Sequence, residues 1–175
     1  MRQPAPIPPD DKDWTWVLGR PCPECGFDAA QHDPRATGDA ILATIPRWQA
    51  VLARPDAGTR ARAEQWSPLE YGCHVRDVCE VFASRLTAMV DQDGAEFSNW
   101  DQDATAIEKR YWAADPAQTS VEYASAATAL AAVFDAVPDN HWQHKGLRSN
   151  GSEFTVETLS AYLVHDFVHH LYDCV

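Results

Sequence analysis

The most constraining part of the sequence is its C-terminal segment, residues 155–174, which reads TVETLSAYLVHDFVHHLYDC. Thr155 is a typical N-cap, and the residues after it fit a helix that is apolar on nearly every side. The exceptions are its histidines and Asp166. A helix of this kind needs packing partners in several directions, because its apolar faces must be removed from water. The segment therefore predicts a helix buried inside a helical bundle.

Helical periodicity recurs earlier in the chain and predicts three more helices, over residues 37–54, 68–94 and 116–136. Ser67 and Glu70 fit the N-cap and N3 positions of a capping box, and Asp115 is a plausible cap for the third helix. The polar stretch DNHWQHKGLRSNG is typical of a loop, and no segment shows the alternation of a strand. The predicted fold is an all-α four-helix bundle over residues 35–175.

Residues 1–34 are rich in proline and acidic residues and show no sustained period, which predicts an extended N-terminal arm. The arm contains the segments DWTW and CPECGFD. We expect Trp14 and Trp16 to pack back onto the bundle, because exposing both would leave an apolar patch.

Charge and hydropathy exclude two classes of partner. Acidic residues outnumber basic ones 26 to 14, giving a formal net charge of −12, which would repel a nucleic-acid backbone. The sequence has no apolar run of the roughly 20 residues that cross a bilayer, and its N-terminus lacks a signal-peptide core. We therefore expect a cytoplasmic protein, a monomer or homodimer, that acts on a small-molecule substrate.

Three histidines have the pattern of a metal site. His165 and His169 are four residues apart, so their imidazoles lie on one helical face, and His74 lies on the inward stripe of the second predicted helix. Three protein ligands leave positions open for water or substrate, which is typical of catalytic rather than structural sites. The pattern predicts that His74, His165 and His169 together hold one divalent ion.

Asp166 and His170 form a second pair at the same spacing, on the neighbouring face of the same helix. Two interpretations of this pair stay open. It is either a competing ligand set or a pair of groups that orient the ligands through hydrogen bonds.

The CPEC segment places Cys22 and Cys25 at the spacing of a zinc knuckle, without a second such pair to complete a site. His32, His141 or His144 could complete a second metal site. The alternatives are a reactive dithiol and, as the leading interpretation, two structural thiols.

A pocket beside the metal is expected to include Trp100 and Asp101, which follow the second predicted helix, and Arg148, which precedes the last. Arg148 suits bidentate contact with a substrate carboxylate. The competing interpretations are that Asp101 caps a helix and that Arg148 is a solvated surface residue.

The segments WSPLEYGCHVRDV and FTVETLSAYLVHDFVHHLYD together resemble the DinB-like superfamily, which includes mycothiol-dependent maleylpyruvate isomerases and other thiol S-transferases. The resemblance covers roughly residues 35–173, and the CPECGFD arm resembles one subgroup. It implies a four-helix bundle with one ligand from the second helix and two, four apart, from the last; these map onto His74, His165 and His169. In the isomerase branch the first ligand of the last helix is a glutamate, so His165 places this chain nearer the all-histidine branch.

The function expected from the resemblance is metal-dependent transfer of a low-molecular-weight thiol to an electrophile, with no catalytic acid or base assigned. Zinc is the expected ion, with nickel or iron as alternatives. Arginine is far commoner than lysine, which suggests a GC-rich genome and mycothiol as the cosubstrate. The alternatives are a metal-dependent hydrolase and a non-catalytic protein that binds a metal or small molecule.

Overall fold

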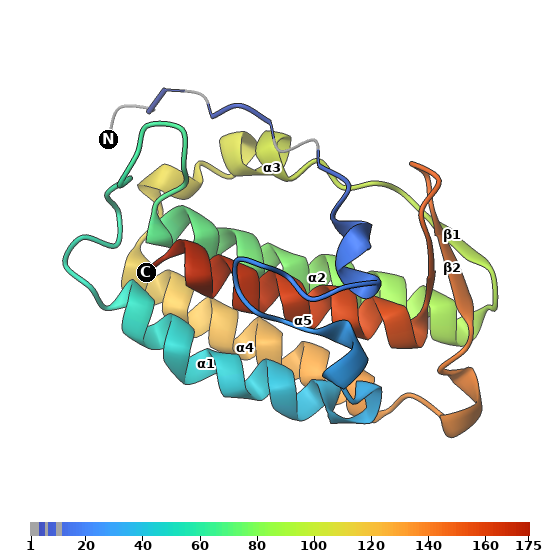
Figure 1. The fold of residues 1–175 in the computed structure, drawn as a ribbon. Coiled ribbons are helices and arrows are strands. Elements are labelled where there is room, and N and C mark those ends of the chain that lie inside the picture. Colours follow the sequence, from blue (N-terminus) through green and yellow to red (C-terminus); the bar gives the residue numbers. More distant parts are fainter. Residues whose placement is uncertain (1–3, 6, 10–11) are drawn as a thin grey trace.

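Four long helices form the body of the protein (Figure 1). The structure is a computed structural model and describes residues 4–5, 7–9 and 12–175. They are α1 (Thr37–Leu52), α2 (Pro68–Asp91), α4 (Pro116–Asp135) and α5 (Val156–Asp173). Helix α4 packs against α1 and α2, and α5 packs against the same two helices from another side. The predicted four-helix bundle is therefore confirmed.

The helices begin where the capping residues predict. The side chain of Ser67 accepts a hydrogen bond from the backbone N–H of Glu70, and the Glu70 carboxylate accepts one from the backbone of Ser67. Asp115 caps α4, and Thr155 caps α5. Each cap satisfies backbone donors that the first turn of a helix leaves without partners, so these positions are fixed by local chemistry.

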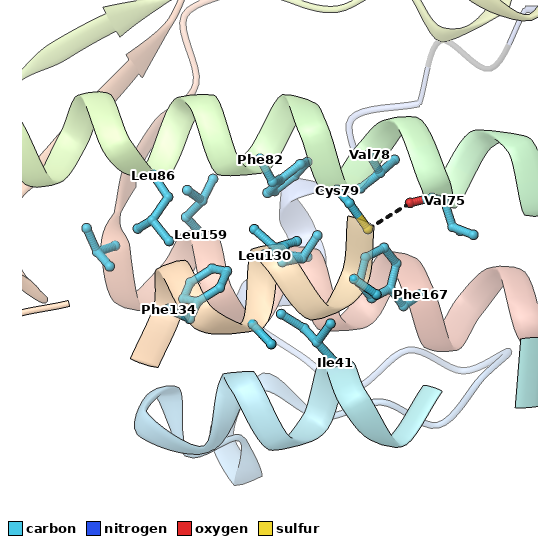
Figure 2. Close-up of a cluster of buried hydrophobic side chains, with 14 of the residues drawn as sticks. Ile41, Val75, Val78, Cys79, Phe82, Leu86, Leu130, Phe134, Leu159 and Phe167 are labelled. Atoms are coloured by element: carbon cyan, nitrogen blue, oxygen red, sulfur yellow. Dashed lines mark hydrogen bonds between the residues drawn. The ribbon is translucent and has the colours of Figure 1, made fainter. Parts of the chain in front are cut away.

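The core lies where α5 faces the other three long helices. Figure 2 shows Leu159 and Phe167 of α5 among side chains from all three. The labelled core residues of those helices are Ile41, Val75, Val78, Cys79, Phe82, Leu86, Leu130 and Phe134. This packing explains why the α5 sequence is apolar on nearly every side.

A small sheet at one end of the bundle was not predicted. Its strands are β1 (Ala95–Phe97), β2 (Lys145–Arg148) and β3 (Glu153–Thr155). Strand β2 pairs in parallel with β1 and antiparallel with β3. The expectation of a loop is wrong for β2, because strands this short carry too few residues to show alternation. Gly146 permits β2 to lie close to α2 and β1, since a Cβ there would lie 2.5 Å from the sulfur of Met89 and 2.6 Å from a ring carbon of Phe97.

The segment between β1 and α4 contains the short helix α3 (Gln102–Glu108) and the 3-10 turn η4 (Tyr111–Ala113). In Figure 1, α3 lies alongside α2, on the side of α2 away from α4.

The N-terminal arm docks along α5, and its blue ribbon crosses that helix in Figure 1. The 3-10 turns η1 (Trp14–Leu18), η2 (Ala29–Gln31) and η3 (Pro34–Ala36) all contact α5. Val17 is completely buried, and the rings of Trp14 and Trp16 stack with centroids 5.9 Å apart. The arm is therefore part of the packed structure, as the two tryptophans suggested.

None of the helices in the described ranges is both long and apolar enough to cross a bilayer.

Docking of the arm predicts that Val17→Ala destabilises the protein. The substitution removes two buried methyl groups, so the free energy of unfolding in urea should fall by roughly 1–2 kcal/mol. Val121→Ala is the matched control, because Val121 is 65% exposed on α4 and should change stability little. Equal stability of the two variants would show that the arm does not dock as described.

Candidate metal centres

Helix α5 presents ionisable side chains in two directions. His165 and His169 lie on one face, and Asp166 and His170 lie about 100° further around the helix. The two faces meet different neighbours, and each pair joins residues from another part of the chain.

The first group, here called the interior cluster, consists of His74, Asp166 and His170. One possible ligand atom from each lies within 4.8 Å of the other two. His74 Nε2 lies 3.7 Å from Asp166 Oδ2, and His170 Nε2 lies 3.6 Å from Asp166 Oδ1. Two ligands with bonds of 2.0–2.2 Å to one ion can be at most about 4.3 Å apart, so both distances fit a shared ion.

Polar atoms of the interior cluster lack hydrogen-bond partners within the part of the chain that the structure describes. Both ring nitrogens of His74 and Oδ2 of Asp166 are buried and unpaired, and His74 is 1% exposed. Burying such atoms without partners is costly. A cation between them would satisfy two of the three, so these residues fit a metal ion.

Neighbouring side chains hold the interior cluster in place. His170 Nδ1 lies 2.9 Å from Asp173 Oδ2, which leaves Nε2 directed toward the cluster. The ring of Trp100 stacks on His74, with centroids 5.4 Å apart and planes 11° apart. Burial alone would lower the pKa of His170, but Asp166 and Asp173 raise it to about 9. Burial alone would raise the pKa of Asp166, but His170 and His74 lower it.

The second group, here called the arm cluster, consists of Cys22, Cys25, His165 and His169, again with ligand atoms within 4.8 Å of one another. Cys22 Sγ lies 3.6 Å from His169 Nδ1, and Nε2 of His165 is buried without a hydrogen-bond partner among the described residues. Burial lowers the pKa of His165 to about 4, with a further contribution from His169. Burial also raises the pKa of the Cys25 thiol to about 11.

The structure thus separates the three histidines expected to share one ion. His74 joins Asp166 and His170, while His165 and His169 join the cysteines. Asp166 and His170, the competing ligand set on the neighbouring face of α5, are the pair that meets His74 of α2. The sequence could not decide this, because adjacent residues of α5 differ only by rotation about its axis and the facing side depends on packing.

Cys22 and Cys25 lie beside His165 and His169, and not beside the three histidines that the sequence suggested for a second metal site. His32 lies near Thr37 and Ser160, with its Nε2 3.0 Å and 3.3 Å from their hydroxyl oxygens. His141 and His144 stack on each other instead, with ring centroids 4.1 Å apart. None of these three belongs to a ligand cluster within the described residues.

A cavity of about 410 Å³ opens beside both clusters. Four residues of α5 line it: His165, Asp166, His169 and His170. The structure also brings Trp100, Asp101 and Arg148, the three pocket residues expected from the sequence, to its wall. The arm contributes Lys12, Asp13 and Trp14.

The pocket residues have structural roles as well. Asp101 caps α3 by accepting a hydrogen bond of 2.8 Å from the backbone of Ala104, so it serves both as a cap and as a wall. Arg148 donates to the side chains of Asn150 and Ser152 at 2.9 Å each. These bonds hold the guanidinium at the cavity.

Sequence reasoning missed Asp77, a buried carboxylate one turn after His74. Its oxygens accept hydrogen bonds from Arg76 and Lys109, each at 2.9 Å, and from the Tyr111 hydroxyl. Burial alone would raise the pKa of Asp77, but these bonds lower it. They fasten η4 and the end of α3 to α2, which positions one wall of the cavity. A charged residue on the inward stripe of α2 was the available signal.

Comparisons with known proteins agree on the fold. The model of the DinB superfamily matches residues 54–174. Among solved structures, YfiT from Bacillus subtilis matches with a TM-score of 0.71 and 14% sequence identity, covering 82% of this chain and 86% of YfiT. It is described as a probable metal-dependent hydrolase with an unusual four-helix bundle topology. No curated protein matches this chain.

The contacts of Asp77 predict that Asp77→Ala is strongly destabilising. It removes one of the two carboxylate partners of Arg76 and leaves the buried Tyr111 hydroxyl without its acceptor, so the free energy of unfolding should fall by about 3 kcal/mol. Asp91→Ala is the control, since Asp91 is exposed near the end of the same helix and should change stability by less than about 0.5 kcal/mol. Chemical denaturation measures both, and similar values would contradict the structural role of Asp77.

Proposed function

This chain belongs to the DinB superfamily, and we propose that it is a metal-dependent enzyme whose centre is the interior cluster of His74, Asp166 and His170. The observation that carries the proposal is the pair of unsatisfied atoms, His74 Nε2 and Asp166 Oδ2, which face each other across 3.7 Å. Asp166 and His170 also line the cavity, so a substrate bound there would reach the centre.

The donor set supports a catalytic rather than a structural site. Two imidazoles and one carboxylate are three ligands, which leave a coordination position open. We expect zinc, with nickel or iron as alternatives, because all three accept nitrogen and oxygen ligands. When bound, such an ion supplies Lewis acidity that lowers the pKa of a thiol or water beside it.

The surrounding residues have roles in binding and orientation. Asp173 fixes the tautomer of His170, so that Nε2 faces the centre. Trp100 holds the plane of the His74 ring. Arg148, fixed by Asn150 and Ser152, would bind an anionic group of the substrate.

For the reaction, we propose transfer of a low-molecular-weight thiol, mycothiol or a similar compound, to an electrophilic small molecule. The order of ligands supports this choice. With Asp166 in first place on α5, a carboxylate is followed four residues later by a histidine. The sequence pattern alone placed the chain nearer the all-histidine branch through His165. With Asp166 as the ligand, the order is nearer to that of the glutamate-containing isomerase branch.

Hydrolysis is the second candidate, because the structurally similar YfiT is described as a probable metal-dependent hydrolase. The same three ligands would then serve to activate water. The two candidates differ in one requirement, since only thiol transfer depends on an added thiol.

The proposal predicts that His170→Ala and Asp166→Asn each weaken metal binding at the interior cluster by at least about 100-fold, because two ligands remain. Activity should be lost with the metal, while helical circular dichroism is retained. His141→Ala is the matched control, since His141 lies outside both clusters. Metal content is measured in untagged protein, and activity is measured on electrophiles with and without thiols and on a panel of esters and amides.

The outcomes separate the candidates. Turnover that requires a thiol supports transfer, and thiol-independent cleavage supports hydrolysis. Tight metal binding without turnover of any substrate in either panel contradicts the enzyme proposal and indicates a binding protein. If His169→Ala removes the ion from His74 while His170→Ala does not, the proposed ligand set is wrong and the triad of His74, His165 and His169 replaces it.

A further inference from the structure

The arm cluster is separate from the proposed centre and has a different donor chemistry. Two cysteines, Cys22 and Cys25, approach α5 from the arm, and two histidines, His165 and His169, meet them there. Cys22 and both histidines are buried, at 2%, 3% and 5% exposure, and Cys25 is partly buried. The cysteines are not joined by a disulfide in the structure.

From this arrangement we propose that Cys22, Cys25, His165 and His169 form a closed, four-coordinate zinc site that fastens the N-terminal arm to α5. Two thiolates and two imidazoles are one of the standard ligand sets of structural zinc. Each thiol releases its proton when the ion binds. All four positions are then filled by protein, so this site is structural and leaves no place for a substrate.

The distances match the dimensions of such a site. With Zn–S bonds of about 2.3 Å and Zn–N bonds of about 2.05 Å, a tetrahedral ion holds neighbouring sulfur and nitrogen atoms about 3.6 Å apart. Cys22 Sγ and His169 Nδ1 are 3.6 Å apart. The buried Nε2 of His165 has no hydrogen-bond partner among the described residues, and an ion would satisfy it.

The backbone of the arm is folded to present both sulfurs. Gly26 N–H donates to the carbonyl of Cys22 at 2.9 Å, and Cys22 N–H donates to the carbonyl of Phe27 at 2.8 Å, which closes a tight loop around the CPEC segment. Gly26 has a φ of +75°, in the left-handed region that favours glycine. This turn brings two cysteines three apart in sequence to the same face of α5.

Groups around the cluster complete its environment. His169 Nε2 lies 3.6 Å from Glu24 Oε2 and 3.9 Å from Asp173 Oδ1, so its second nitrogen faces carboxylates when Nδ1 faces Cys22. Metal-bound histidines are commonly oriented by a carboxylate in this way. Trp14 and Phe27 pack against the two imidazoles, with ring centroids 4.7–5.8 Å apart, and shield the cluster from water.

The site has a consequence for the cavity. The arm that it fastens supplies Lys12, Asp13 and Trp14 to the cavity wall. Asp173 contacts His169 of the arm cluster and His170 of the interior cluster through its two oxygens. The zinc site would thus hold one wall of the cavity and a shared carboxylate in place without taking part in the chemistry.

Cobalt substitution tests the site, because Co²⁺ bound by thiolate gives a near-ultraviolet charge-transfer band that a site of histidine and carboxylate lacks. The full-length protein, untagged and kept reduced, is stripped of metal and loaded with Co²⁺. The band is expected in wild-type protein and in His74→Ala, and it should be lost in the double variant Cys22→Ser, Cys25→Ser. Cys79→Ser is the matched control, since its hydroxyl can replace the hydrogen bond that Cys79 makes to Val75.

A second measurement does not depend on any variant. Removing zinc from wild-type protein with a chelator should increase cleavage by a glutamate-specific endopeptidase after the exposed Glu24 by at least about tenfold, because the arm opens more often when its anchor is lost. Readdition of zinc should reverse the change. Helical circular dichroism should stay constant throughout, because the bundle core does not include the arm cluster.

The proposal is overturned if reduced wild-type protein shows no thiolate band, or if the double cysteine variant keeps it. A cleavage rate after Glu24 that does not change with zinc contradicts the anchoring role. These results are independent of the proposed function, because loss of the arm site leaves His74, Asp166 and His170 intact. A failure of the proposed function would be seen instead in the activity measurements and in the metal content of His170→Ala.

Discussion

The burial of α5 is the constraint on which the rest of the structure depends. Its apolar residues fill the core between α1, α2 and α4, and the arm covers its remaining side. A helix enclosed in this way has little room for polar side chains, since each buried imidazole or carboxylate needs a partner. The two turns of α5 that carry His165, Asp166, His169 and His170 therefore require groups from elsewhere in the chain.

Those partners come from two directions, and they divide the ionisable residues of α5 into two sets. Helix α2 supplies His74 to one face, and the arm supplies two thiols to the other. The two sets differ in the number and softness of their ligands. Three nitrogen and oxygen donors beside a cavity suit an exchangeable, reactive ion, whereas two sulfurs and two nitrogens suit a closed structural ion. One helix would then serve a chemical and a structural purpose on adjacent faces.

The cavity is also assembled from parts that are distant in the sequence. The sheet holds Arg148, the segment fastened by Asp77 carries Trp100 and Asp101, and the arm adds Trp14. The wall therefore depends on three separate anchors to the bundle. With a formal net charge of −12, the protein as a whole attracts cations toward such a site.

Local chemistry determined much of this protein from the sequence alone. The caps at Ser67, Asp115 and Thr155 fixed where three helices begin, and the all-round apolar pattern of the last segment required a bundle. The same reasoning found every histidine of the two clusters and both arm cysteines. The sequence did not predict the short sheet, because strands of three or four residues are too short to show an alternation of apolar and polar residues.

Only the tertiary structure decided which ionisable residues share a site. Residues 165 and 166, like 169 and 170, are neighbours in sequence but point about 100° apart around α5. Whether His74 meets one pair or the other depends on the rotation of α5 against α2, which is set by core residues such as Phe167 and Phe82 that are not ligands themselves. The place of Cys22 and Cys25 depends equally on how the arm docks. The sequence contains the spacing of the ligands along α5. The direction in which each ligand points is set by how the core side chains pack.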